Sequence, residues 1–289
     1  MIISQNSEFR IMNLLAREWF REFSAYELAH ESMISVPMVY KTIKKFLFFG
    51  LISNKKNKIK INLNNLFSYN FKILCDSERI YNLSKDMQEK IFFVFNIFKE
   101  EYSNNLLSFL VFGSVASNET TEKSDIDFLV IVKKKKEIDY KKRGLLKIGK
   151  INLIEKEKNE FESDYLLADE LVLNALMNGI IVFDSGFVRF FLVKPLPEPS
   201  YESVMQKKER LTALKERLLI LLKDKDYKNL VEQFKLYIIE KARVSLLEKG
   251  IIPRSKKFII SQLKEIDKNF YNFYKRANKR NIAQLIEKL

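Results

Sequence analysis

The sequence LLSFLVFGSVASNETTEKSDIDFLVIV, residues 106–132, contains the pattern that decides the fold of the middle of the chain. Two apolar runs, 106–112 and 128–132, are typical of buried strands. Gly113-Ser114 ends the first run, and Asp125-Ile126-Asp127 leads directly into the second. Because side chains alternate along a strand, Asp125 and Asp127 share one face, about 6–7 Å apart at the backbone. Two carboxylates beside a Gly-Ser turn predict a site for Mg²⁺ and the phosphates that it binds.

These residues resemble the polymerase-β-type nucleotidyltransferase superfamily, and within it the minimal nucleotidyltransferase branch. The signature of that superfamily is Gly-Ser, a short spacer and Asp-x-Asp after a strand, and here ten residues separate Ser114 from Asp125. The resemblance implies that Asp125 and Asp127 are catalytic and hold two Mg²⁺ ions. It also implies that Gly113, Ser114 and Ser124 bind an NTP, with ATP among the candidates. A hydroxyl acceptor, with RNA or protein favoured, would attack the α-phosphate, and pyrophosphate would leave.

The next core strand departs from the superfamily pattern, which usually places a third carboxylate there. That strand is predicted at 150–154, and its residue on the side of the site is Asn152. Asparagine is a neutral ligand and cannot act as a general base. Glu155 follows closely, but alternation predicts it on the other face. Asn152 therefore leaves two interpretations open, an active transferase and a domain that binds nucleotide without turnover.

The first 70 residues predict three helices followed by a two-stranded hairpin. Helices are expected over 7–20, 25–31 and 36–48, with a capping box formed by Ser24 and Glu27. Strands are expected at 51–53 and 58–63, around a turn at 54–57. This order, with YELA at 26–29, VYKT at 39–42 and FGLI at 49–52, resembles the winged helix-turn-helix family. The resemblance implies a recognition helix at 36–48 and nucleic-acid contacts from these residues: Ser35, Tyr40, Lys41, Lys44, Lys58 and Lys60.

Basic side chains are concentrated in the two end regions of the sequence. In all, 51 Lys and Arg face 37 Asp and Glu, which gives a net charge of +14. Residues 1–70 carry ten basic and five acidic side chains, and residues 200–289 carry 22 and 11. Between residues 32 and 70 there are seven lysines and no acid. This stretch favours contact with DNA phosphates, while a solvated lysine-rich face and docking of another protein are the alternatives.

The rare residue types and the apolar stretches indicate the cellular environment. The single cysteine, Cys75, excludes an internal disulfide and suits a reducing compartment. The single histidine, His30, excludes a His–His metal pair. The first residues lack the pattern of a signal peptide, and the longest uncharged stretch, 102–118, is too short to span a membrane. We therefore expect a cytoplasmic protein without membrane association.

The other segments predict a connector, further helices and a linker. Residues 64–83 show no clear period and are expected to be a connector. They are followed by an expected helix over 84–102 capped by Ser84, a helix over 157–178, a strand at 180–183, a turn at 184–186 and an extended segment to 193. Prolines at 195, 197 and 199 predict a stiff linker over 194–200. The last part is expected to be helical over 201–223, 226–249, 256–266 and 268–287.

Residues 241–253, in this last part, resemble the HEPN family of helical domains. Active HEPN ribonucleases carry an Arg…His motif, and this segment has no histidine, which excludes RNA cleavage by that route. The resemblance implies a domain that packs against the transferase, dimerises or binds the substrate. A plain helical bundle is the alternative.

Together these patterns predict an α+β multidomain chain. Its parts are a winged helix over 1–70, a nucleotidyltransferase domain with a mixed sheet and flanking helices over 71–199, and a HEPN-like helical domain over 200–289. The predicted function is Mg²⁺-dependent transfer of an NMP from an NTP to a hydroxyl, coupled to nucleic-acid binding by the winged helix. The alternative is a DNA-binding transcriptional regulator, or an antitoxin, whose degenerate transferase domain senses nucleotide. Besides nucleic acid and an NTP, the candidate partners are a protein acceptor, a toxin and a second copy of the chain.

Overall fold

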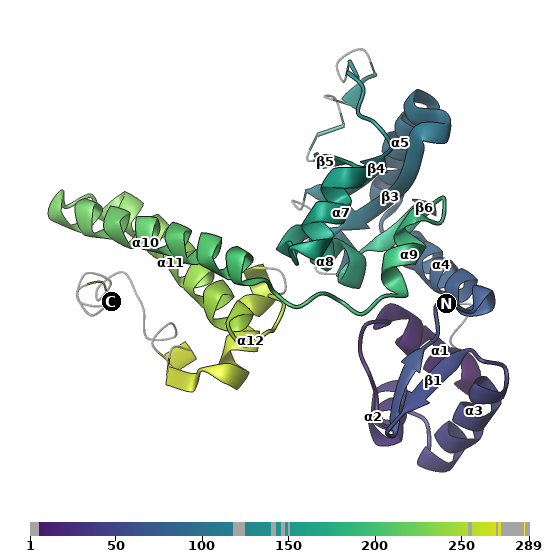
Figure 1. Cartoon of the computed structure of the whole chain (residues 1–289). Coiled ribbons are helices and arrows are strands. Elements are labelled where there is room, and N and C mark those ends of the chain that lie inside the picture. Colours follow the sequence, from purple (N-terminus) through teal and green to yellow (C-terminus); the bar gives the residue numbers. More distant parts are fainter. Residues whose placement is uncertain are drawn as a thin grey trace. The chain divides into compact units, whose positions relative to one another are not determined.

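The structure is a computed structural model that describes residues 6–117, 125–139, 143–145, 148–149, 151–253, 256–269, 271–272 and 286 (Figure 1). The chain divides into two compact units. The first comprises residues 1–162 and 174–196, and the second comprises residues 163–173 and 197–289. No helix in the described ranges is long and apolar enough to cross a membrane.

The first unit begins with three helices and a hairpin. The helices are α1 (Ser7–Arg17), α2 (Ala25–Ser32) and α3 (Val36–Phe48). Strands β1 (Ile52–Lys55) and β2 (Lys58–Ile61) pair antiparallel around Lys56 and Asn57, which both have positive φ. The predicted capping box of Ser24 and Glu27 is present at the start of α2. The predicted elements of this part are therefore confirmed as elements, with bounds that differ by a few residues.

Helix α4 (Leu66–Tyr81) occupies the segment that the sequence analysis expected to be a connector, and that prediction was wrong. Asn65 caps the helix by accepting from the backbone N–H groups of Phe67 and Ser68. The buried face of α4 includes Lys72 and Asp76, which form an ion pair at 2.9 Å. Because two charged side chains lie on the buried face, the apolar period that normally marks a helix is interrupted.

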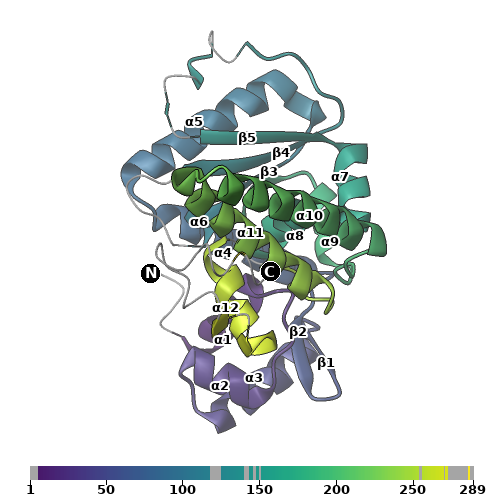
Figure 2. The same cartoon turned by 90° about the vertical axis from the view of Figure 1, so that its left-hand side faces the viewer.

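The first unit also contains a four-stranded mixed sheet (Figures 1 and 2). Its strands are β3 (Leu106–Phe112), β4 (Ile126–Val132), β5 (Ile151–Glu157) and β6 (Ile180–Asp184), in the order β5-β4-β3-β6. Strands β4 and β5 are parallel, and the other two pairings are antiparallel. The strands at 106–112 and 180–183 are confirmed, and the strands predicted at 128–132 and 150–154 are longer than expected.

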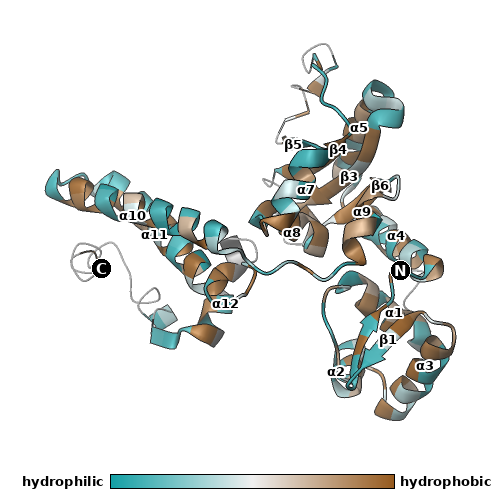
Figure 3. Ribbon diagram, in the orientation of Figure 1, coloured by the Kyte–Doolittle hydropathy of each residue, from teal (hydrophilic) through white to brown (hydrophobic). Residues whose placement is uncertain are grey.

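Helix α5 (Lys85–Tyr102) packs on one face of this sheet, and Ser84 caps it as predicted. The short 3-10 helix η1 (Ser103–Asn105) joins α5 to β3. Phe98 of α5 contacts Phe109 of β3, whose ring in turn lies 5.3 Å from that of Phe128 in β4. The hydropathy colouring shows β3 and β4 as apolar along most of their length (Figure 3). Because Phe128 points to α5, its neighbour Asp127 points to the opposite face of the sheet.

Two further expectations about the chain after β5 are corrected. The helix expected over 157–178 is divided into α7 (Lys158–Leu166) and α8 (Glu170–Asn178). Ala168 has a φ of 55° at the break, and the carboxylate of Asp169 accepts from two backbone N–H groups of the next turn. The segment expected to be extended up to 193 contains α9 (Phe187–Leu192), because Asp184 accepts from the N–H groups of Val188 and Arg189.

The second unit is mainly helical, with α10 (Tyr201–Lys223), α11 (Tyr227–Leu247) and α12 (Lys256–Ile266). These three helices agree with the predicted ones, and the helix predicted over 268–287 lies largely outside the described residues. Their core consists of apolar side chains from all three helices, including Leu218, Phe234, Ile238 and Leu263.

Candidate active site

Gly113 lies at the point where β3 passes into the short helix α6 (Gly113–Ala116). Phe112, the residue before it, pairs with Asp127 across the sheet. Gly113 has a φ of +71°, a conformation that costs little only for glycine. A Cβ at this position would overlap Oδ2 of Asp127. The glycine therefore allows the backbone to lie directly against the Asp127 carboxylate.

The two predicted carboxylates lie at the start of β4. Asp127 is half-buried in the strand, and Asp125 precedes it and is exposed. Burial raises the pKa of Asp127, and the like charge of Asp125 adds to that rise, while the hydrogen bond from Asn152 opposes it. A cation beside the pair would relieve both unfavourable contributions.

Asn152 occupies the position on β5 that pairs with Asp127. Its Nδ2 donates to Oδ1 of Asp127 at 3.1 Å. Glu155 lies on the other face, as expected, where its Oε1 accepts from the hydroxyl of Tyr102. An amide, and not a third carboxylate, therefore stands beside Asp127. Within the described ranges, no group of three Asp, Glu, His or Cys side chains could hold a metal ion.

Of the two serines predicted at the nucleotide site, the structure describes Ser114 but not Ser124. Ser114 is the second residue of α6 and is partly buried. The hydroxyl of Ser117, just after α6, is within hydrogen-bond distance of the carbonyl oxygens of Gly113 and Ser114, at 3.2 and 3.3 Å. Ser124 lies outside the described residues, so the structure does not place it.

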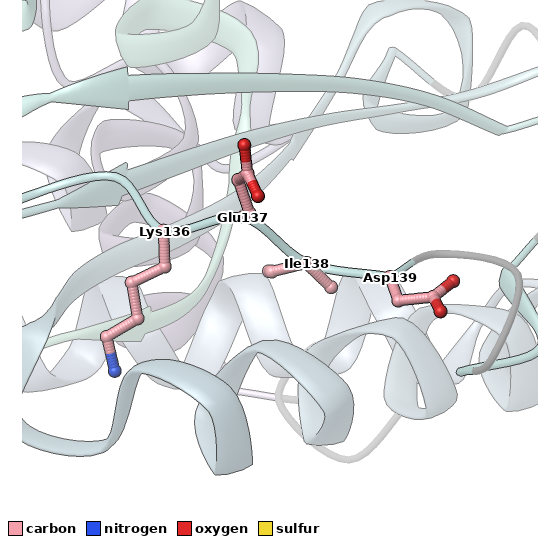
Figure 4. A pocket seen from close by; sticks show the side chains of 4 residues that line it. All are labelled: Lys136, Glu137, Ile138 and Asp139. Carbon is pink, nitrogen blue, oxygen red and sulfur yellow. The ribbon is translucent and has the colours of Figure 1, made fainter.

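The far end of β4 carries the lysine run 133–136 and a hollow of about 540 Å³, lined by Lys136, Glu137, Ile138 and Asp139 (Figure 4). Lys135 pairs with Glu160 at 2.7 Å, and Lys136 donates to the carbonyl oxygen of Glu101. Since Asp125 and Asp127 lie at the start of β4 and this hollow follows its end, the structure does not bring these lysines to the carboxylates.

Arg79 of α4 is a residue of this region that the sequence analysis missed. It donates to the carbonyl oxygens of Ala116 at 2.6 Å, Asn178 at 2.8 Å and Gly179 at 3.0 Å. Ala116 is the last residue of α6, so Arg79 contacts the helix that begins with Gly113-Ser114. The spacing of Lys72, Asp76 and Arg79 is typical of ion pairs on one helix. This spacing is the sequence feature that could have indicated a helix here and drawn attention to Arg79.

The residues predicted to contact nucleic acid lie mostly on the surface. Ser35, Tyr40, Lys41, Lys44 and Lys58 are exposed, whereas Lys60 is only partly exposed. The ammonium of Lys60 lies 5.9 Å from the ring centroid of Trp19, and burial lowers its pKa. His30 is exposed on α2.

Comparison with known proteins supports the sequence pattern in the sheet. Residues 94–188 match the family model of the nucleotidyltransferase domain. The matched segment includes the second half of α5, all four strands of the sheet, Gly113, both carboxylates and Asn152. No similar protein was found among the curated proteins.

Two solved structures show distant similarity to this chain. A nucleotidyltransferase-like protein from Exiguobacterium sibiricum 255-15 is 15% identical with a TM-score of 0.41, covering 67% of this chain and 70% of that one. The spectinomycin adenyltransferase of Enterococcus faecialis, solved with ATP and spectinomycin, is 18% identical with a TM-score of 0.40. That comparison covers 69% of this chain and 96% of the adenyltransferase.

Proposed function

We propose that this protein transfers an NMP from an NTP to a hydroxyl group of an acceptor. Asp125 and Asp127 are the catalytic and metal-binding residues of this proposal, and Gly113, Ser114 and Ser124 bind the nucleotide. One observation carries it: Gly113, in a conformation suited to glycine, lies against the half-buried carboxylate of Asp127 within the segment that matches the nucleotidyltransferase domain. Because the protein carries many basic side chains, RNA or a protein is favoured as the acceptor.

The chain's own groups have separate roles in this proposal. Asp125 and Asp127 would hold Mg²⁺, which when bound neutralises phosphate charge and stabilises the attacking and leaving oxygens. Gly113 leaves room for its backbone to lie against the Asp127 carboxylate, and the Ser114 hydroxyl donates to a phosphate oxygen. Asn152 orients the Asp127 carboxylate through Nδ2 but cannot take up the proton of the acceptor hydroxyl. That proton therefore passes to another group or to water.

The test is transfer of label from each α-³²P-labelled NTP in the presence of Mg²⁺. Total RNA, the protein itself and a cell lysate are offered as acceptors. The variant Asp125→Ala/Asp127→Ala removes the carboxylate pair. Glu137→Gln/Asp139→Asn removes the same amount of charge beyond the other end of β4 and serves as the matched control. We expect label transfer by the wild type and the control, and none by the carboxylate variant.

Two results would contradict this proposal. Equal transfer by the wild type and the carboxylate variant would show that another site, or a contaminant, carries the activity. Absence of transfer to every acceptor, with nucleotide still bound in a Mg²⁺-dependent manner, would replace it by the second candidate function.

The second candidate is a DNA-binding regulator or antitoxin whose transferase domain senses nucleotide. Two observations favour it, the amide of Asn152 beside Asp127 and the exposed lysines on α3 and the hairpin. In this proposal α3 is a recognition helix that enters a groove of duplex DNA. The candidate requires duplex binding that changes on addition of Mg²⁺ and nucleotide, and a fluorescence anisotropy titration measures it. Failure to bind duplex at low salt would rule it out.

A further inference from the structure

Arg79 connects three pieces of backbone that are distant in the sequence. Its Nη2 donates to the carbonyl oxygens of Ala116 and Asn178, and its Nη1 donates to that of Gly179 and to Oδ1 of Asp76. Asn178 ends α8, and Gly179 immediately precedes β6. Ala116 is the last residue of α6. One planar guanidinium therefore fixes the end of α6 relative to α4 and to the start of β6.

The buried charges around Arg79 keep its guanidinium in place. Asp76 accepts from Lys72 and Arg79 and also from the backbone N–H of Ile181 in β6. Lys72 and Asp76 are almost fully buried, and the side chain of Arg79 is 16% exposed. Because Asp76 is tied to β6 as well as to Arg79, the guanidinium has little freedom to turn away from Ala116.

The position of α6 determines how the Gly113 backbone meets Asp127. Helix α6 has only four residues, and the N–H of Ser117 donates to the Gly113 carbonyl at its end. Arg79 holds that end, while β3 holds the beginning. A shift of the Ala116 carbonyl therefore moves Gly113 and Ser114 relative to the Asp127 carboxylate, which already lies in close contact with Gly113.

We infer that Arg79 is a positioning residue for the nucleotide-binding turn, acting through the Ala116 carbonyl on Gly113-Ser114. This inference rests on the proposed nucleotide site but concerns a residue of α4, outside the matched segment. Arg79 does not contact the nucleotide in this proposal. Its loss loosens α6 and weakens binding of a Mg²⁺–nucleotide complex, because misplacement of a phosphate-binding backbone costs affinity.

The test compares Arg79→Met and Arg79→Lys with Arg189→Met in the full-length protein. Arg79→Met leaves Lys72 and Asp76 as a neutral pair, so it buries no uncompensated charge. Arg189→Met is the matched control, because Arg189 also donates to backbone carbonyl oxygens, those of Leu63 and Asn64, but not to α6. Hydrogen exchange of the amides at 113–117 reports on α6, and titration with a fluorescent ATP analogue and Mg²⁺ reports on binding.

We expect Arg79→Met to accelerate exchange at 113–117 and to weaken binding of the analogue about tenfold or more, in keeping with the cost of misplacing a binding group. Arg79→Lys should recover part of both effects, since a lysine donates to fewer carbonyl oxygens at once. Arg189→Met should change neither. Burial raises the pKa of Cys75 in α4 to about 12, so resistance of this thiol to alkylation at pH 8 shows that α4 remains folded.

Three results would overturn the inference. The first is unchanged exchange at 113–117 with unchanged binding in Arg79→Met. The second is faster exchange throughout the first unit together with alkylation of Cys75, which would show a general structural role. The third is an equal effect of Arg189→Met. If the wild type binds no nucleotide, the proposed function fails, while the exchange measurement still tests whether Arg79 holds α6.

Discussion

Gly113 combines two requirements that only a glycine satisfies, a positive φ and the absence of a Cβ that would meet Asp127. We predict that Gly113→Ala abolishes Mg²⁺-dependent nucleotide binding, because the new methyl group displaces the Asp127 carboxylate. The left-handed conformation alone costs about 1–2 kcal/mol. Isothermal titration of Mg²⁺ and nucleotide measures the binding loss.

Gly144 supplies the control for this prediction. It has a φ of +74°, and a Cβ there would meet no atom of the described residues within 4 Å. Gly144→Ala therefore carries the same backbone cost without a clash. If both variants bind nucleotide equally well, the contact between Gly113 and Asp127 does not matter for the site.

Asn152 stands where a carboxylate would complete the group around Asp127. We predict that Asn152→Asp strengthens Mg²⁺ binding and raises the rate of NMP transfer, by as much as the ~10²–10⁴-fold that a positioned general base contributes. Initial rates with labelled NTP measure the gain. Asn159→Asp, which adds one charge at an exposed position of α7, is the control. A rate that falls or stays constant would show that Asn152 does not limit catalysis.

At the scale of elements, α4 is held by the buried ion pair of Lys72 and Asp76. We predict that Asp76→Ala destabilises the first unit by about 3–5 kcal/mol, because it leaves the buried ammonium of Lys72 without its partner. Urea unfolding followed by the fluorescence of Trp19 measures this change. Trp19 is the single tryptophan, is buried in the first unit and donates to the carbonyl oxygen of Leu176.

An exposed ion pair with the same spacing along its helix is the control, because it shows the effect of losing an ion pair that is not buried. Lys85 and Glu89 on α5 lie 3.9 Å apart with side chains that are 90% and 69% exposed. We expect Glu89→Ala to change stability by less than about 1 kcal/mol. A similar loss in both variants would mean that burial of Lys72 adds nothing.

At the scale of the whole molecule, the net charge of +14 favours binding to polyanions such as DNA. We predict that duplex binding weakens steeply with salt and that Lys41→Ala/Lys44→Ala lowers the slope of log K against log salt by about two, one for each lost phosphate contact. Lys223→Ala/Lys228→Ala removes equal charge from exposed positions in the second unit and is the control. An equal change of slope in both variants would show that net charge, and not α3, governs binding.

The sequence by itself determined the parts of the protein that follow a local rule. Apolar runs predicted β3 and β6, and the Ser24 and Ser84 caps predicted the starts of α2 and α5. The alternation of side chains placed Asn152 next to Asp127 and Glu155 on the other face. The family match supports the predicted nucleotidyltransferase domain over residues 94–188, whereas the roles of Gly113-Ser114 and Asp125-Ile126-Asp127 remain predictions. The winged-helix and HEPN-like assignments and the three domain boundaries remain predictions.

Only the tertiary structure decided the elements whose signals depend on distant partners. Helix α4 lacked an apolar period because its buried charges are satisfied by each other and by β6. Helix α9 begins where Asp184, which also accepts from Tyr69 and Ser108, caps it. Arg79 reaches Ala116 only because α4 lies beside β6 in the folded chain. A sequence pattern does not predict a charged side chain on the buried face of a helix, because burial of a charge is unfavourable without a partner. That partner can lie far along the chain and comes close only in the folded protein.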